Sequence, residues 1–353
     1  MALIPAAASD ALARLSEFDT VIDARSESEY ALDRLPGAVN WPSLNDDERR
    51  IVGTEYTHDS PFVAKKRGAA LVARNIAHHI EREVMYKPKD WKPLVYCWRG
   101  GKRSGALALV LDQIGFQVHV LEGGYREYRR AVVAALEVLP AQFQYRVVCG
   151  TTGSGKSHLL QVLADQGEQV LDLEALANHR GSVLGLVPGS PQPSQKQFDS
   201  RLWDTLRRFD PARTVWVESE SKKVGDLRVP DTLIEPMRAA PCFALELPLE
   251  ARVALLMADY RHFVTDTPAF CQRLDALRSL RGNEIVNGWQ EAARAGRTAD
   301  VVRELLLMHY DPIYLQSMRR NFAGFAPLKL SVGWDGSTQA LAAAASRLIA
   351  AAA

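Results

Sequence analysis

The segment around Cys97 has the residue types and spacing of a nucleophilic site. The apolar stretch 93–97 (PLVYC) runs into the cysteine, a glycine-bearing turn follows, and a helical pattern covers 104–115. This order places the sulfur at the carboxyl end of a parallel strand, where open α/β sheets bind ligands. Backbone N–H groups of the turn and the helix N-terminus favour a thiolate there. The turn consists of Trp98, Arg99, Gly100, Gly101, Lys102, Arg103 and Ser104.

Basic residues in this turn strengthen the prediction. Arg99, Lys102 and Arg103 place three formal positive charges close to the cysteine in sequence. Positive charge lowers the pKa of a thiol, and the same loop would bind an oxyanion. A buried, inert cysteine at a strand end is the alternative, but this density of basic residues and glycines favours a reactive site. We therefore predict Cys97, Arg99 and Arg103 as catalytic and the rest of the turn as an anion-binding loop.

A second anion-binding pattern begins at Gly150. Residues 150–157 (GTTGSGKS) match G-x4-G-K-[ST] in full, between a strand predicted over 144–150 and a helix predicted over 157–167. The backbone of such a loop wraps a phosphate, Lys156 adds a point charge, and the Ser157 hydroxyl can ligate Mg²⁺. A nucleoside triphosphate and a pyrophosphate ester would both fit. The predicted phosphate-binding residues are Gly150, Thr151, Thr152, Gly153, Ser154, Gly155, Lys156 and Ser157.

Carboxylates that follow predicted strands are candidates to support Mg²⁺, directly or through a second residue. The strand at 214–218 ends in glutamate, where this kind of fold usually carries an aspartate. Each such carboxylate is about as often a solvated charge at a strand end, so the sequence does not choose among them. The candidates are Asp172, Glu174, Glu218 and Glu220.

Short apolar runs alternate with helical patterns along the whole chain, which predicts an α/β fold with open parallel sheets. A boundary near Leu139 divides it into domains 1–138 and 139–353, and the pattern beyond residue 250 is mainly helical. The Pro-, Gly- and Ser-rich stretch 186–197 is predicted to be a surface loop. The predicted strands are 20–23, 93–97, 118–121, 144–150, 169–173, 214–218 and 242–247.

Composition limits the classes of function. The chain has 353 residues and a net charge of +1, so any nucleic-acid surface must be a local patch. Its four cysteines are far apart, with no CxxC pair and no Cys/His cluster at metal-ligand spacing, which argues against a disulfide framework or a zinc site. The N-terminus lacks the pattern of a signal peptide, and no apolar run approaches about 20 residues. We expect a cytoplasmic protein without a membrane partner.

Three segments of the first domain resemble the rhodanese signature. They are 21–25 (VIDAR), 34–40 (RLPGAVN) and 121–125 (LEGGY). The resemblance covers about residues 10–135 and implies that Cys97 carries a transferable sulfur or selenium atom. The spacing Cys-x5-Arg is one residue longer than usual, which raises a Cys-dependent phosphatase or arsenate reductase as an alternative. Tyr96 stands where such phosphatases commonly carry histidine, and no aspartate general acid is evident.

In their order along the chain, the two loops and many further segments resemble the tRNA 2-selenouridine synthase family. The resemblance implies a rhodanese-like selenium- or sulfur-transfer domain followed by a P-loop NTPase-like α/β domain with a helical C-terminal part. The further segments are 40–42, 46–49, 52–54, 64–66, 68–69, 123–125, 171–174, 177–182, 192–195, 218–221 and 309–312.

The resemblance also implies a reaction. The family replaces the sulfur of 2-thiouridine at the tRNA wobble position with selenium, using selenophosphate, after geranyl diphosphate has placed a geranyl group on that sulfur. Cys97 would handle selenium, the rest of its turn would hold selenophosphate, and the loop around Lys156 would hold the diphosphate. Mg²⁺ is expected, a tightly bound organic cofactor is not, and a selenophosphate synthetase would be the donor source. A P-loop kinase with a regulatory rhodanese-like domain is a further alternative.

Contacts to tRNA have weaker support in the sequence. Arg126 and Arg129 share a predicted helix with two tyrosines, a mixture that can contact phosphates and stack on bases. His179 and Arg180 follow a strand and form a second candidate contact. An ordinary solvated helix face and an ordinary loop are the alternatives.

Overall fold

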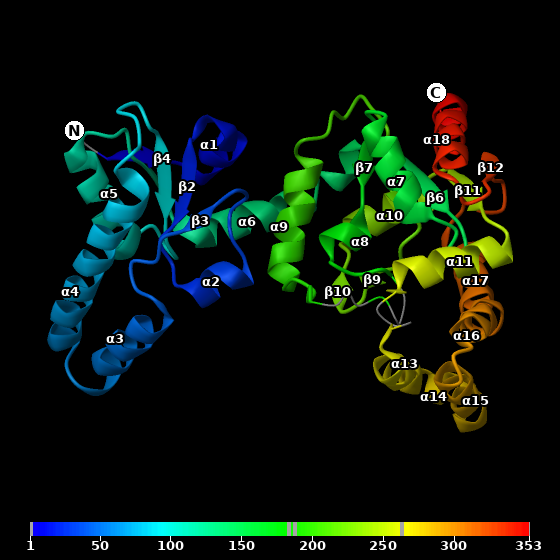
Figure 1. The fold of residues 1–353 in the computed structure, drawn as a ribbon. Helices are drawn as coiled ribbons and strands as arrows, with labels where there is room; N and C mark the ends of the chain where they lie inside the picture. The colour runs from blue at the N-terminus through cyan, green and yellow to red at the C-terminus, as the bar shows by residue number, and fades with distance from the viewer. Residues whose placement is uncertain (1–2, 182–184, 186–188, 262–264, 353) are drawn as a thin grey trace. The chain divides into compact units, whose positions relative to one another are not determined.

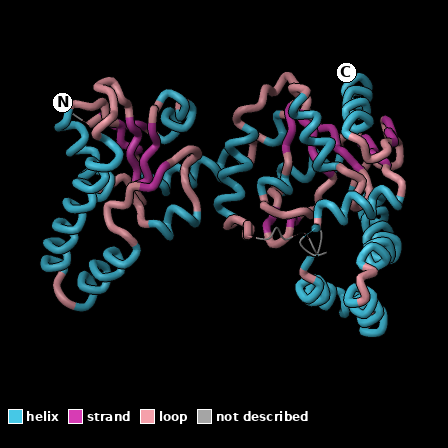
Figure 2. The backbone as a smooth tube through the Cα atoms, in the orientation of Figure 1, coloured by secondary structure: helices cyan, strands magenta, loops and turns pink. Residues whose placement is uncertain are grey.

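The computed structural model describes residues 3–181, 185, 189–261 and 265–352 (Figure 1). The chain forms two compact units, and each has its own parallel strands and surrounding helices (Figure 2). The first unit comprises Met1–Leu136 and Pro193–Asp204, and the second comprises Glu137–Gln192 and Thr205–Ala353. The division between residues 138 and 139 stays a prediction. Across the described residues, no helix is long and apolar enough to cross a membrane.

The first unit is built on a five-stranded sheet in the order β1-β5-β4-β2-β3, with every pairing parallel. Because the strands are parallel, their carboxyl ends meet at one edge, where Asp23 pairs with both Tyr96 and Asn40. The turn that carries Cys97 follows at this edge. The strands are β1 (Ile4–Ala6), β2 (Thr20–Asp23), β3 (Val39–Asn40), β4 (Pro93–Tyr96) and β5 (His119–Leu121).

Local signals in the sequence fix the helices of the first unit. Asn45 and Glu48 form a capping box that starts α3, Pro61 occupies the first turn of α4, and Gly115 ends α5 in the left-handed conformation. The helix α4 continues as a π-helical turn over Ile80–Val84. The helices are α1 (Ala8–Ala13), α2 (Glu27–Leu32), α3 (Asp46–His58), α4 (Pro61–His79), α5 (Lys102–Ile114) and α6 (Gly124–Leu136).

The helix α9 (Gln195–Leu206) is distant in sequence, yet its residues up to Asp204 belong to the first unit. The ring of Trp203 lies 5.8 Å from that of Tyr128 on α6, edge to face. The guanidinium of Arg129 donates to Asp199 Oδ2 at 3.0 Å. The stretch predicted as a loop over 186–197 therefore ends in a helix from Gln195, and its residues 186–188 lie outside the described residues.

The second unit repeats the parallel plan with the strand order β12-β11-β6-β8-β7. A two-stranded antiparallel ribbon, β9 with β10, lies apart from this sheet. Helices dominate after β11, as expected from the sequence. The strands are β6 (Tyr145–Cys149), β7 (Gln169–Leu171), β8 (Val215–Glu218), β9 (Lys223–Val224), β10 (Leu227–Arg228), β11 (Cys242–Glu246) and β12 (Leu330–Gly333). The helices used below are α7 (Lys156–Asp165), α8 (Leu173–Leu176), α11 (Leu249–Asp259), α14 (Arg278–Arg281), α17 (Asp311–Asn321) and α18 (Thr338–Ala352).

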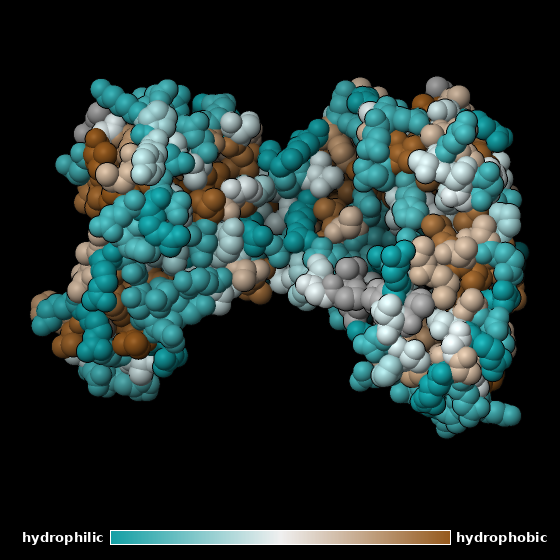
Figure 3. Space-filling model, in the orientation of Figure 1, coloured by the Kyte–Doolittle hydropathy of each residue, from teal (hydrophilic) through white to brown (hydrophobic). Residues whose placement is uncertain are grey.

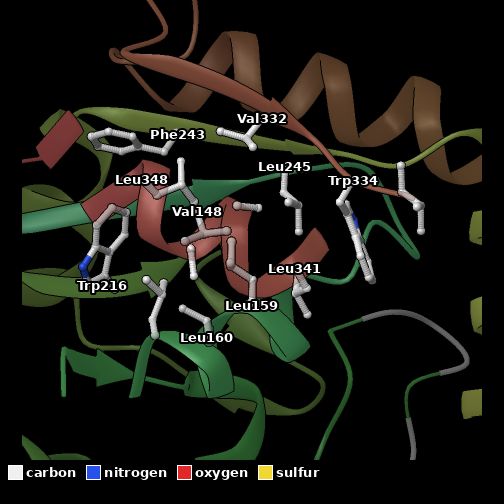
Figure 4. Packing of buried hydrophobic residues seen from close by; sticks show 14 residues of the cluster. Val148, Leu159, Leu160, Trp216, Phe243, Leu245, Val332, Trp334, Leu341 and Leu348 are labelled. Carbon is white, nitrogen blue, oxygen red and sulfur yellow. The ribbon is translucent and has the colours of Figure 1, made fainter. Parts of the chain in front are cut away.

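A hydrophobic cluster holds the P-loop strand and helix in the second unit (Figure 4). Val148 on β6 and Leu159 on α7 flank the loop itself, and both are fully buried. Trp216 packs edge to face on Phe243, with 5.1 Å between the rings. Because Leu348 of the last helix joins the same cluster, the C-terminus closes the core beneath the loop.

The substitution Leu348→Ala tests this closure. We expect it to lower the free energy of unfolding of the second unit by about 2–5 kcal/mol, because it leaves a cavity in a fully packed site. Urea titration followed by tryptophan fluorescence would measure the change. The control Leu307→Ala removes a side chain that is 52% exposed, and it should cost less than about 1 kcal/mol. Equal effects of the two changes would contradict the packing role of Leu348.

Candidate functional site

The Cys97 sulfur is buried and faces hydrogen-bond donors. Its Sγ accepts from the backbone N–H of Gly101 at 3.3 Å and from the Ser104 hydroxyl at 3.1 Å. Burial opposes ionisation, but the Ser104 hydroxyl and the N–H groups of Ser104, Arg99 and Gly101 outweigh it and lower the pKa of the Cys97 thiol. The loop therefore stabilises a thiolate, as the strand–turn–helix pattern predicts.

The loop keeps its shape because it packs against the turn before α6. The backbone N–H of Tyr125 donates to Cys97 O at 2.8 Å. Gly124 has φ +59°, and a Cβ built there would lie 2.2 Å from the same carbonyl oxygen. No other residue fits so close to the backbone of the reactive turn. The segment LEGGY, which resembles the rhodanese pattern, thus has a direct structural role.

A buried polar network supports the strand that carries the cysteine. Arg25 forms an ion pair with Asp23 at 2.6 Å, and both side chains are almost fully buried. The Tyr96 hydroxyl donates to the same carboxylate at 2.7 Å. The Arg25 guanidinium also lies 3.9 Å from the centre of the Tyr125 ring. Removing one partner of a buried ion pair leaves an uncompensated charge, so any rearrangement that separates Asp23 from Arg25 is costly. The network therefore holds the sheet edge beside Cys97 in one arrangement.

The basic residues of the turn point to different partners. Arg103 donates to Glu29 Oε2 at 2.8 Å, so its guanidinium is held by a carboxylate. Burial alone would raise the pKa of Glu29, but the bond from Arg103 and its charge lower it. Arg99 and Lys102 are exposed, and Trp98 stacks on Tyr125. The structure thus brings Gly101 and Ser104 to the sulfur, while catalytic roles for Arg99 and Arg103 stay predictions.

The second site is the P-loop between β6 and α7. Lys156 Nζ donates to Gly150 O at 2.7 Å, and Ser157 Oγ donates to Glu174 Oε2 at 3.0 Å. Gly155 has φ +90°, and a Cβ there would lie 2.4 Å from the Trp334 ring. The indole N–H of Trp334 also donates to Ser154 O at 2.9 Å. The predicted loop is therefore packed from behind by a residue that follows β12.

Residues of the helical C-terminal part also bind the backbone of the P-loop. The sequence did not indicate these roles. The Tyr314 hydroxyl accepts from the backbone N–H of Gly150 at 2.8 Å. Arg252 Nε donates to Thr152 O at 2.9 Å, and its two terminal nitrogens bind Asp311 at 2.6 and 2.9 Å. The segment 309–312, which carries Asp311, stands out in the sequence only through the family resemblance.

The four candidate carboxylates differ in position. Asp172 caps α8 by accepting from Ala175 N, and Glu218 Oε1 accepts from Glu174 N at 2.8 Å. Glu218 is fully enclosed, and its Oε2 has no hydrogen-bond partner among the described residues. Burial, then the nearby Glu174 charge, raises the pKa of Glu220 to about 8. Buried like charges of this kind fit a cation nearby.

A magnesium ion would therefore have a consistent place here. Within the described ranges, no group of three or more His, Cys, Asp or Glu side chains is arranged to hold a metal by itself. The ion would be held by the Ser157 hydroxyl, a carboxylate of this cluster, water and ligand phosphate oxygens, which suits Mg²⁺. When bound, it would supply positive charge to the phosphate oxygens of a ligand.

A cavity of about 760 Å³ opens in front of the P-loop. Lys156, Ser157, Glu174 and Glu220 line one part of it. Apolar side chains from α11, α14 and α17 and the residues near them form another part of the lining, with polar residues such as Asp259 and Ser317 among them. Its apolar residues include Leu255, Leu256, Leu280, Ile313, Met318 and Phe322. The cavity can thus accept a ligand with a charged head and a hydrocarbon body.

The predicted tRNA contacts lie in two places. His179 and Arg180 line the cavity, where His179 Nδ1 accepts from Gly181 N at 3.1 Å and the Arg180 guanidinium lies 4.6 Å from the Tyr260 ring centre. Burial lowers the pKa of His179. Arg126 is exposed, whereas Arg129 is tied to Asp199, which favours a packing role for it. Contact of any of them with tRNA stays a prediction.

The fold and the two loops define a two-domain α/β protein that joins a thiolate site to a P-loop. The sequence profile described as the rhodanese-like domain matches residues 7–131, and the one described as the tRNA 2-selenouridine synthase AAA domain matches 143–282. The tRNA 2-selenouridine synthase of Aeromonas salmonicida is 30% identical over 84% of this chain and 87% of that protein. The chain belongs to the tRNA 2-selenouridine synthase family, a family of enzymes.

Two further relatives match different shares of the chain. The tRNA 2-selenouridine synthase of Nitrosomonas europaea is 34% identical over 71% of this chain and 66% of its own length, slightly under two thirds. That of Bdellovibrio bacteriovorus is 29% identical over 85% of this chain and 89% of its own length. The fold class predicted from the sequence, a rhodanese-like domain followed by a P-loop domain, is confirmed.

The substitution Ser104→Ala should make Cys97 less acidic. A hydrogen bond to a charged group contributes about 1.5–3 kcal/mol, so we expect the midpoint of the pH–rate profile to rise by about one to two pH units. Because only the thiolate reacts, the variant should lose its reactivity at a higher pH than the wild type does when the pH is lowered. Iodoacetamide alkylation, with Cys97→Ala as the blank for the other thiols, measures this. Ser43→Ala removes a hydroxyl that bonds Arg103 O instead and should leave the midpoint unchanged.

Proposed function

We propose that this protein converts 2-thiouridine at the wobble position of tRNA to 2-selenouridine, with selenophosphate as selenium donor and an S-geranylated intermediate formed from geranyl diphosphate. Family membership supports the tRNA substrate and the use of selenium. The observation that carries the geranyl step is the composition of the second unit's cavity. It joins an anion-binding loop to an apolar wall in one space of about 760 Å³.

The aliphatic side chains of the apolar wall suit a hydrocarbon chain. Leu280 and Ile313 line the cavity, and they are 61% and 47% exposed without a ligand. Covering such side chains contributes about 25 cal/mol for each Å² removed from water. A diphosphate at Lys156 with a short isoprenoid chain against this wall would bury apolar groups at one end and pair charges at the other.

The chemistry of the first step uses the P-loop for a leaving group. The thione sulfur of 2-thiouridine attacks C1 of the geranyl group, the bond from C1 to the diphosphate oxygen breaks, and the uracil N3 proton is released. Negative charge grows on the departing diphosphate. We expect Lys156 and backbone N–H groups of the P-loop to stabilise this charge. No nucleotide hydrolysis is needed.

The first unit serves the second step. Alkylation converts the sulfur into a better leaving group. The selenium of selenophosphate bonds to C2, the C2–S bond breaks and the sulfur departs as geranylthiol. Water then cleaves the P–Se bond and phosphate is released. Cys97 lies in a loop whose hydrogen-bond donors lower the pKa of its thiol, and such a loop of backbone N–H groups also suits selenophosphate, which is an oxyanion. A selenophosphate synthetase would supply this donor.

Two substitutions separate the steps. Lys156→Ala should reduce formation of the geranylated nucleoside at least about 100-fold, since one charged donor to the leaving group is lost. Cys97→Ala should leave that nucleoside to accumulate and abolish 2-selenouridine. Mass spectrometry of nucleosides from a 2-thiouridine anticodon stem-loop, incubated with geranyl diphosphate, selenophosphate and Mg²⁺, measures both. If the wild type left the nucleoside unchanged, the proposed function would be wrong, and phosphatase and kinase assays would follow.

The substitution Ile313→Asn tests the apolar wall. It should weaken binding of geranyl diphosphate about tenfold, because a hydrocarbon contact is replaced by a polar group, and leave inorganic pyrophosphate binding unchanged. Calorimetric titration measures the affinity of the variant for geranyl diphosphate and for inorganic pyrophosphate. The control Leu307→Asn alters an exposed leucine that is not among the lining residues of the cavity. Equal loss for both ligands would show a damaged P-loop and count against a chain-binding role.

A further inference from the structure

Helices α3 and α4 form a hairpin between β3 and β4, here named the α3–α4 arm (residues 46–79). The arm does not include the Cys97 loop, which covers residues 97–104. We propose that the arm is an RNA-binding surface that holds the tRNA body while the wobble base lies at the reactive edge of the first unit. This inference rests on tRNA being the substrate.

The base of the arm abuts the reactive loop. Ser43, just before α3, donates from its hydroxyl to Arg103 O at 3.0 Å, and Arg49 on α3 lies 3.4 Å from the Glu29 carboxylate that holds Arg103. The helix α3 has 13 residues, which is a length of about 20 Å. The two helices project beyond the sheet on the side where the strands end (Figure 1). The arm therefore reaches outward from the edge that carries Cys97.

The arm is held as a rigid pair of helices. A Cβ at Gly68 would lie 3.3 Å from a methyl group of Val52, so the helices cross at close range. Arg67 on α4 pairs with Glu55 on α3 at 2.7 Å. Asn75 donates to Glu48 Oε2 at 2.6 Å near the base. A rigid arm can position a ligand at a set distance from the thiolate.

The outer end of the arm combines exposed aromatic rings with positive charge. Phe62 is 68% and Tyr56 51% exposed, and Lys66 Nζ lies 5.0 Å from the centre of the Phe62 ring. The sequence of α4 carries Lys65, Lys66, Arg67 and Arg74 and contains no Asp or Glu. Within the described residues, neither lysine forms an ion pair. Hydrophobic and hydrophilic residues alternate on the visible face of this region (Figure 3).

This combination favours RNA over a protein partner. Lysine is depleted at the centre of protein interfaces. In RNA-binding surfaces, lysine and arginine bind phosphates, and the aromatic rings beside them stack on bases. The chain as a whole carries a net charge of only +1, so attraction to a polyanion needs a local patch of this kind. The carboxylates of the arm lie on α3 and in the turn after it, whereas α4 has none over its 19 residues, so the patch is confined to the α4 side around Lys65 and Lys66.

The test is binding of full-length tRNA that carries 2-thiouridine, followed by fluorescence anisotropy over a range of salt concentrations. The double variant Lys65→Ala/Lys66→Ala should weaken binding at least about tenfold near 0.1 M salt and lower the slope of log K against log salt by about 1.4–1.8. Phe62→Ala should weaken binding about tenfold with the slope unchanged, because stacking carries no counterion release. The charge-matched control Lys87→Ala/Lys89→Ala changes the exposed segment after α4 and should behave as the wild type.

The outcomes separate this inference from the proposed function. Wild-type protein that binds no tRNA would overturn both. Wild-type binding with unchanged affinity and slope in both arm variants would overturn the arm alone. Sedimentation that shifts from dimer to monomer in the Phe62→Ala variant would show that the arm binds a second copy of the chain, which would also overturn the RNA-binding role.

Discussion

Backbone N–H groups at the end of a buried parallel strand are the feature on which both sites depend. Cys97 follows β4 and precedes α5, and the P-loop follows β6 and precedes α7. At Cys97 the turn directs the Gly101 N–H and the Ser104 hydroxyl at the sulfur, and a helix begins there. The P-loop motif predicts the same use of N–H groups for a phosphate. A thiolate and a diphosphate are chemically different, but both are anions that such a turn stabilises without a long side chain.

These turns hold their shape because charged side chains are buried behind them. The Asp23–Arg25 pair fixes the sheet edge beside Cys97, and the Arg252–Asp311 pair holds the P-loop carbonyl of Thr152. Pairs of this kind add little net stability, since desolvation offsets their attraction, but breaking one leaves a buried charge. Their value is geometric, because they permit one arrangement of the loop and disfavour others.

Local patterns in the sequence predicted β2, β4, β5, β6, β7, β8 and β11 and both turns, because a buried strand that runs into a glycine turn and a helix is a contiguous signal. They did not indicate the short strands β1, β3, β9 and β10, or β12, which lies in the stretch expected to be mainly helical. The strand predicted over 20–23 is β2, and the residues of the P-loop motif lie where expected. The contacts that complete the sites come from far along the chain. Tyr314 meets Gly150 across 164 positions, and no periodicity could indicate that pairing. The sequence could not indicate the pairing of Arg103 with Glu29 either, because 74 positions separate the two residues.

Housing the two chemistries in different units has a chemical reason under the proposed function. A thiolate is a soft nucleophile, and next to an activated geranyl carbon it would compete with the thione sulfur for alkylation. The acidic cluster near the P-loop would also raise the pKa of a nearby thiol. Because the two chemistries belong to different sites, the same tRNA base must visit both in turn. An attachment outside both sites would keep the tRNA at high effective concentration between the steps, so the geranylated base need not be released and recaptured.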